Sequence, residues 1–177
     1  MEKIARFYKE HKFLSNFYPH RPNGGTYNNP VVVMYNGLQF NSVESAYMAA
    51  KTLDPELQKQ IQKMSPFQSK AFSKLGGIPV RDDWEDVKIS IMTDLVGQKF
   101  KNSPQLKKML LGTGGCIIEE GNLHEDTFWG INLETGKGNN HLGQILMRLR
   151  EEIRGQSKRN ECKVSKSDNN GPSSSPS

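Results

Sequence analysis

A turn-rich segment at residues 124–140 combines side chains that are suited to binding and cleaving a ligand. It contains a carboxylate, Asp126, an indole, Trp129, and the amide of Asn132, set among several glycines. An indole can stack on a heterocyclic ring, and a carboxylate can act on a substrate as an acid or base. The segment therefore predicts a site for a flat polar ligand. A core tryptophan beside a turn-forming aspartate is the structural alternative, and both interpretations stay open.

A second carboxylate, Glu44, lies in a segment with helical periodicity. Residues 41–44 resemble a capping box that opens a helix to about residue 53. Glu44, Met48 and Lys51 share one side of this helix, next to its apolar positions. A carboxylate at the rim of a core can have its pKa raised by desolvation and then serve as an acid or base near neutral pH. The alternative is that Glu44 only starts the helix.

Two further segments are candidates for binding an anion. Trp84 and Lys88 lie one turn apart on a helix expected at 82–102, where Trp84 packs in the core and Lys88 faces an anion or solvent. Residues 136–140 precede the last helix, and backbone N–H groups at a helix start beside Lys137 favour phosphate. An ordinary turn with an asparagine cap explains the same residues.

An aromatic segment at residues 13–19 surrounds Asn16. This segment either walls a ligand pocket, with Asn16 as a substrate contact, or anchors the first strand to the core. The four histidines show no HExxH motif and no close spacing to a cysteine. We therefore expect neither a metal ion nor a cofactor.

The remaining pattern predicts a mainly helical α+β fold, with residues 1–154 as a single domain. We expect strands at 4–9, 31–35 and 116–119, and helices at 41–53, 54–64, 65–75, 82–102, 104–111 and 140–154. Residues 155–177 contain no Leu, Ile, Phe, Tyr or Trp. Such a composition cannot bury enough apolar surface to offset ordering entropy, so we expect a disordered polar tail.

Composition narrows the functional classes. The net charge is +5, of which +2 lies in residues 155–177 and +3 in residues 1–154. This is too mild for a dedicated nucleic-acid-binding protein but is compatible with an anionic nucleotide as substrate. Two cysteines and the lack of an apolar leader or membrane-spanning run indicate a reduced, cytoplasmic protein that does not bind membranes.

The chain also carries five colinear segments, at residues 13–19, 40–51, 84–92, 122–130 and 140–150. Together they resemble the NADAR superfamily, whose better-known members are the YbiA-like N-glycosidases, over about residues 4–153. The resemblance implies a compact, mainly helical α+β fold and metal-free hydrolysis of an N-glycosidic bond. Family substrates include phosphorylated ribosylamino intermediates of riboflavin synthesis and ADP-ribose attached to a base, notably guanine in nucleic acid.

The resemblance also implies which residues line the pocket. By motif they are Glu44, Trp84, Lys88, Asp126 and Trp129. Where many members read Trp-Gly-x-Gly, this chain has Asn132 in the last position. That difference adds a side-chain amide near the expected pocket and bears on substrate preference.

The expected chemistry is the cleavage of a bond between ribose and a base. By analogy with glycosidases, one carboxylate activates water and stabilises the oxocarbenium-like transition state, while a second group protonates or hydrogen-bonds the base. Our hypothesis assigns the water to Glu44 or Asp126 and the ribose hydroxyls to the other carboxylate. The base contact is then Trp129 or Trp84, and the phosphate contact is Lys88 or Lys51.

The expected partner is a small nucleotide-like glycoside or an ADP-ribosylated nucleic acid. A rival hypothesis from another class is a non-catalytic module that binds ADP-ribose or a related nucleotide. A nucleic-acid-binding protein is the third interpretation, and it predicts strongly salt-dependent binding to a duplex.

Overall fold

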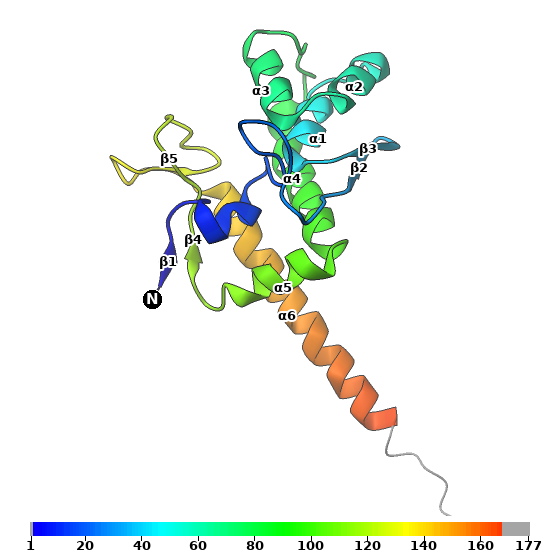
Figure 1. The fold of residues 1–177 in the computed structure, drawn as a ribbon, viewed down its shortest axis with the longest axis vertical. Helices are drawn as coiled ribbons and strands as arrows, with labels where there is room; N and C mark the ends of the chain where they lie inside the picture. The colour runs from blue at the N-terminus through cyan, green and yellow to red at the C-terminus, as the bar shows by residue number, and fades with distance from the viewer. Residues whose placement is uncertain (1, 168–177) are drawn as a thin grey trace, which may run out of the picture.

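The computed structural model describes residues 2–167, with the side chains of residues 2–159, and shows a mainly helical α+β fold (Figure 1). The expected fold class is therefore confirmed. The strands are β1 Lys3–Ile4, β2 Val33–Tyr35, β3 Leu38–Phe40, β4 Ile117–Ile118, β5 Gly121–Asn122 and β6 Ile131–Asn132. The helices are the 3-10 helix Lys9–Leu14 and α1 Val43–Ala50, α2 Pro55–Gln62, α3 Pro66–Lys74, α4 Trp84–Lys101, α5 Pro104–Gly112 and α6 His141–Ser167.

Helix α1 lies at the centre of the fold, because every one of its residues is buried. A helix that is buried on all sides packs inside a protein rather than on its surface. Helix α1 contacts α2, α3 and α4, as well as the β2–β3 hairpin. Its acidic residue, Glu44, is therefore placed inside the molecule together with Tyr47 and Met48.

The start of α1 differs from the capping box predicted at residues 41–44. Ser42 is the N-cap, and its Oγ accepts a hydrogen bond from the backbone N–H of Ser45 at 3.1 Å. Glu44 lies in the first turn, but its carboxylate is directed towards Lys70 of α3. Helix capping therefore does not explain why a glutamate is buried at this position.

Within the described residues, six short strands form three separate pairs. Strands β1 and β4 are parallel, β2 and β3 form an antiparallel hairpin, and β5 and β6 are parallel. The strand expected at 4–9 is confined to β1, and residues 9–14 form the 3-10 helix instead. Strand β3 was not predicted, because three residues are too few to show alternation. The pairs β1–β4 and β5–β6 hold the segment that leads into α6.

Helix α6 is longer than predicted. The sequence predicts its end at Arg154, but the helix continues to Ser167 and projects from the body of the protein (Figure 1). Within this extension, Gln156 Nε2 donates to Glu152 Oε1 at 3.3 Å, and Ser157 Oγ donates to the carbonyl of Ile153 at 3.2 Å. A helix already nucleated by packing can be extended by one hydrogen bond per residue, which explains the difference. Residues 168–177 of the expected tail lie outside the described residues.

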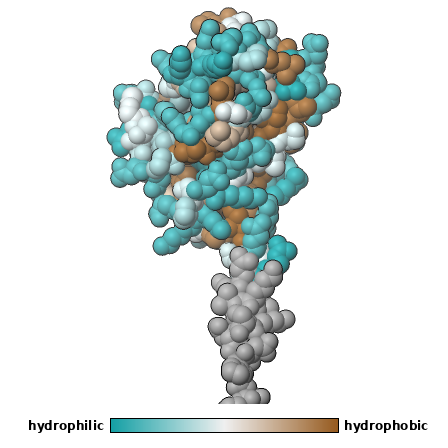
Figure 2. Space-filling view, turned by 90° about the vertical axis from the view of Figure 1, so that its right-hand side faces the viewer, coloured by the Kyte–Doolittle hydropathy of each residue, from teal (hydrophilic) through white to brown (hydrophobic). Residues whose placement is uncertain are grey.

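The surface is mixed in character. The face drawn in Figure 2 is largely hydrophilic, with smaller hydrophobic areas between the polar side chains. Among the residues that the structure describes, no helix has both the length and the apolar character needed to cross a bilayer.

Candidate active site

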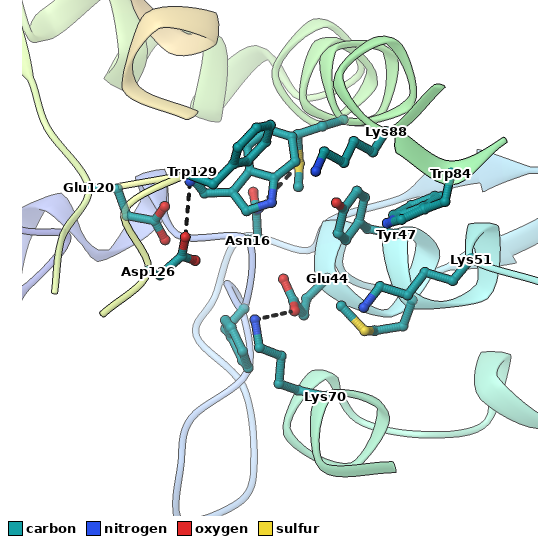
Figure 3. A pocket seen from close by; sticks show the side chains of 14 residues that line it. Asn16, Glu44, Tyr47, Lys51, Lys70, Trp84, Lys88, Glu120, Asp126 and Trp129 are labelled. Atoms are coloured by element: carbon teal, nitrogen blue, oxygen red, sulfur yellow. Dashed lines mark hydrogen bonds and ion pairs between the residues drawn. The ribbon is translucent and has the colours of Figure 1, made fainter. Parts of the chain in front are cut away.

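A cavity of about 290 Å³ lies between α1, α3, α4 and the segment at residues 120–129 (Figure 3). Seven of the eight residues expected from the sequence line it, although they are spread over more than 100 positions of the chain. They are Asn16, Glu44, Lys51, Trp84, Lys88, Asp126 and Trp129. The residues expected to do chemistry are thus brought together in one place.

Asn132 is the exception, and its placement corrects the expectation. Its Oδ1 accepts hydrogen bonds from the backbone N–H groups of Glu134 and Thr135, both at 2.9 Å. An asparagine that accepts from its own following residues stabilises a turn. The Trp-Gly-Ile-Asn variation therefore shapes the turn after β6 and adds no amide to the cavity.

Residues 136–140 form an ordinary turn and do not contribute to the cavity. The backbone N–H groups at the start of α6 are used by the neighbouring segment, since Leu142 N–H donates to the Trp129 carbonyl at 3.1 Å. The N–H of Asn140 likewise donates to the Gly130 carbonyl at 3.2 Å. These groups are therefore not available for a phosphate, and the turn interpretation holds.

Glu44 is the carboxylate at the centre of the cavity in Figure 3. It is only 4% exposed, and its Oε1 lies 3.2 Å from Nζ of Lys70. Burial alone would lower the pKa of Lys70, but the Glu44 carboxylate outweighs burial and raises that pKa above its ordinary value. The ion pair therefore places the ammonium group of Lys70 inside the cavity. The sequence did not predict Lys70 as a site residue, because a lysine on an amphipathic helix is usually expected at the surface.

Asp126 belongs to both the turn and the cavity. Its Oδ1 accepts a hydrogen bond from the backbone N–H of Trp129 at 3.0 Å, and its carbonyl accepts one from Asn122 Nδ2 at 3.0 Å. The same residue also lines the cavity next to Glu120 (Figure 3). The two interpretations of Asp126 are thus compatible, because one oxygen is used by the turn and the other is not.

Glu120 is a third acidic residue of the cavity, and it was missed. Its Oε2 is buried and has no hydrogen-bond partner among the described residues. Burial, followed by the charges of Asp126 and Glu44, raises the pKa of Glu120 to about 8. Its position in the sequence could have identified it as a site residue. Glu120 directly follows the apolar strand expected at 116–119, where the chain is still close to the core.

Aromatic side chains form one wall of the cavity. The Tyr47 ring lies 4.9 Å from Trp84 and meets Trp129 edge-on at 5.6 Å. Burial raises the pKa of Tyr47, so its hydroxyl stays protonated and can donate a hydrogen bond. Asn16 is 7% exposed and lies at the back of the cavity, where its buried Oδ1 has no hydrogen-bond partner among the described residues.

Two lysines lie at the end of the cavity opposite Glu120 and Asp126 (Figure 3). Lys51 donates from Nζ to Ser73 Oγ at 3.1 Å, and burial, followed by the charge of Lys70, lowers its pKa. Lys88 is ion-paired with Glu85 and lies 3.9 Å from the centre of the Phe128 ring. The cavity therefore has an acidic end and a basic end.

A larger groove of about 1230 Å³ adjoins the cavity. The two share Phe17, Lys70, Glu120 and Asp126 as lining residues, so they form one continuous depression. The groove carries further aromatic and basic side chains, including the parallel-stacked Tyr18 and Tyr27 with ring centres 5.6 Å apart. Lysines and aromatic rings that line one groove suit a ligand that has both phosphates and bases.

The described part of the chain contains no group of three His, Cys, Asp or Glu residues arranged to hold a metal ion. The acids of the cavity are instead distributed among lysines and aromatic rings.

Residues 6–154 match the NADAR domain family, and the chain is therefore a member of that family. The fold is also that of YbiA from E. coli, whose NMR structure matches with a TM-score of 0.72 at 28% sequence identity. The match covers 89% of each chain.

Relatives with curated names fall into two groups. The N-glycosidase YbiA of Escherichia coli (strain K12) is 31% identical over 145 residues, which are 79% of this chain and 88% of that protein. A riboflavin biosynthesis protein of Vibrio vulnificus is 33% identical over 157 residues, 86% of this chain and 39% of that protein. The chloroplastic riboflavin biosynthesis protein PYRR of Arabidopsis thaliana is 50% identical over 78 residues, 44% of this chain and 13% of that protein. The chain thus spans well under half of the riboflavin biosynthesis relatives.

Proposed function

We propose that this protein is a hydrolase that cleaves the N-glycosidic bond between ribose and a heterocyclic base. The observation that carries the proposal is the convergence of Glu44 and Asp126 with two tryptophans and three lysines on one cavity. Membership of the NADAR family and similarity to an N-glycosidase over most of both chains support the same reaction.

Cleavage of the C1′–N bond places positive charge on the ribose and negative charge on the departing base. Glu44 forms an ion pair with Lys70, and it faces the centre of the cavity. We assign it to orient the attacking water and to stabilise the oxocarbenium-like transition state, which is the task of the basic carboxylate in glycosidases. Asp126 then binds ribose hydroxyls with the oxygen that the Trp129 N–H does not use.

The two ends of the cavity fit the two ends of such a substrate. Lys51 and Lys88 bind the phosphate, because both are cationic side chains at the basic end. Trp129 and Trp84 contact the base or the ribose through their ring faces and edges, and an aromatic contact of this kind contributes about 1–3 kcal/mol.

The sizes of the cavity and the groove indicate which substrates fit the site. A phosphorylated ribosylamino intermediate of the riboflavin pathway would occupy the 290 Å³ cavity. An ADP-ribosylated base, such as ADP-ribosyl-guanine in nucleic acid, would occupy the cavity and extend into the 1230 Å³ groove. The stacked tyrosines and the lysines of the groove support the larger substrate.

The test is to incubate the purified protein with a ribosylaminopyrimidine phosphate, with NAD and with ADP-ribosyl-guanine DNA. We expect free base to be released from at least one of them, as followed by mass spectrometry, and the preferred compound identifies the substrate class. Saturable quenching of tryptophan fluorescence without release of base over hours would instead identify a non-catalytic nucleotide-binding module and overturn the proposal.

A further inference from the structure

Glu120 is a half-buried acidic residue that neither the water nor the ribose of the proposed reaction requires. It lies where the cavity meets the groove and lines both. Its Oε2 is buried and has no hydrogen-bond partner among the described residues. A buried polar atom without a partner costs about 1–3 kcal/mol, so its position at a ligand cavity indicates that a ligand atom supplies the partner.

The backbone of Glu120 is held firmly, which fixes where its carboxyl group can reach. Its N–H donates to Oδ1 of Asn140 at 3.0 Å, and its carbonyl accepts from the N–H of Ile131 at 2.9 Å. Gly130 packs so closely that a Cβ at that position would lie 2.2 Å from the Glu120 carbonyl oxygen. Asn140, which directly precedes α6, and the chain at residues 130–131 therefore hold the backbone of this residue in place.

The surroundings of Glu120 favour its neutral form. Burial disfavours the carboxylate, and so do the negative charges of Asp126 and Glu44, whereas the positive charge of Lys70 opposes them. The pKa of Glu120 is accordingly raised to about 8, so the group carries a proton at neutral pH. A carboxyl that is neutral beside one that is ionised is the arrangement by which glycosidases divide acid and base roles.

We propose that Glu120 is the catalytic acid of this site and donates its proton to the departing nitrogen of an amine-linked base. As the C1′–N bond breaks, its electron pair goes to that nitrogen, which takes the proton from Glu120 and leaves as a neutral amine. The water oxygen forms the new bond to C1′, and its proton passes to Glu44. Glu120 is left as a carboxylate, and solvent restores its proton and removes the one on Glu44.

This role depends on the chemistry of the leaving group. An amine attached to ribose is a poor leaving group without a proton, whereas a pyridinium base, as in nicotinamide mononucleotide, departs as a neutral molecule and needs none. Loss of the acid should therefore slow the first kind of substrate and spare the second. The inference rests on the proposed N-glycosidase function, but different experimental results would overturn the function and the role of Glu120.

The test compares the wild-type protein with Glu120→Gln on a ribosylaminopyrimidine phosphate and on nicotinamide mononucleotide. We expect kcat on the amine-linked substrate to fall by about 10²–10⁴, the usual contribution of one positioned acid. Turnover of the pyridinium compound should change little. The wild-type rate should decline above about pH 8, and the variant should lack that decline.

Glu119→Gln is the matched control. Glu119 is the adjacent residue, is ion-paired with Lys3 at 3.2 Å and does not line the cavity, so its variant should keep the wild-type rate and pH profile. A second readout is the ¹³C titration of the Glu120 carboxyl carbon, assigned by its absence in Glu120→Gln.

The outcomes separate the two proposals. Wild-type turnover of the amine-linked substrate by Glu120→Gln, or titration of Glu120 near the ordinary glutamate value of about 4.3, would overturn the assignment of the acid and leave the N-glycosidase function standing. A wild-type protein that releases no base from any compound would overturn the function, and the acid with it.

Discussion

At the scale of single residues, two glutamates of one cavity have opposite surroundings. Glu44 Oε1 lies 3.2 Å from Nζ of Lys70, whereas Glu120 is subject mainly to burial and the negative charges of Asp126 and Glu44. Glu44 is therefore ion-paired with a lysine, and the pKa of Glu120 is raised to about 8. Two titratable groups whose environments differ in this way mark the base and the acid of a site.

The substitution Glu44→Gln tests the base. Because Ser42 and not Glu44 caps the helix, we expect the variant to fold while kcat falls by about 10²–10⁴. The measurement is release of base under single-turnover conditions, with thermal unfolding to check the fold. Glu56→Gln, at an exposed ion pair with Lys59 on α2, is the control and should be unaffected. Full turnover by Glu44→Gln would show that Glu44 has a structural role only.

The substitution Lys88→Gln tests the phosphate end of the cavity. A hydrogen bond to a charged group is worth about 1.5–3 kcal/mol, so KM for a phosphorylated substrate should rise about 10–100-fold. The same substrate without its phosphate should bind both proteins equally. Lys101→Gln, which removes a surface ion pair with Glu152, serves as the control. An equal loss on both substrates would show that Lys88 does not contact the phosphate.

At the scale of elements, the start of α6 fixes the acidic segment in place. Asn140 donates from Nδ2 to the Ile118 carbonyl at 2.8 Å and accepts from the Glu120 N–H at 3.0 Å, so one side chain ties α6 to the end of β4. Gly130 and Gly138 let the backbones of this region approach closely, since a Cβ at Gly138 would lie 2.1 Å from the Gly130 carbonyl oxygen. The glycines that read as turn signals in the sequence are thus required for packing.

The substitution Gly130→Ala tests this packing. The added Cβ would lie 2.2 Å from a backbone oxygen, which cannot move as a side chain can. We expect the free energy of unfolding to fall by about 3 kcal/mol, the upper part of the range for overpacking. Gly112→Ala, at an open position in the last turn of α5, should be neutral or stabilising. Urea unfolding measures both, and equal stabilities of the two variants would contradict the packing argument.

At the scale of the whole molecule, Lys99 links helix α4 to the segment that carries Asn16. It is 1% exposed, and its Nζ donates to the Ser15 carbonyl at 2.7 Å. Burial lowers the pKa of Lys99 to about 7. Between this value and the unfolded value of about 10.4, the unfolded chain binds more protons than the folded one. Stability should therefore rise with pH across that window.

The substitution Lys99→Met tests this linkage. The free energy of unfolding of the wild-type protein, measured by urea at pH 6, 8 and 9.5, should include a rise above about pH 7 that Lys99→Met lacks. Lys101→Met, at an exposed position two residues along the same helix, should keep the rise. Parallel curves for the wild type and Lys99→Met would show that Lys99 is charged in the folded protein.

The sequence by itself determined most of the helices, the fold class and seven residues of the cavity. These follow from local patterns, since caps, glycines and apolar periodicity act over a few residues, and from motifs that resemble a known family. Only the tertiary structure shows which side chains contact one another in the cavity. Lys70 and Glu120 read as surface residues, and Asn132 read as a pocket residue, because the sequence does not show which side chains α3, β5 and the turn after β6 bring together. Burial lowers the pKa of Lys99, and burial together with neighbouring charge raises that of Glu120; both effects depend on contacts between segments far apart in the chain.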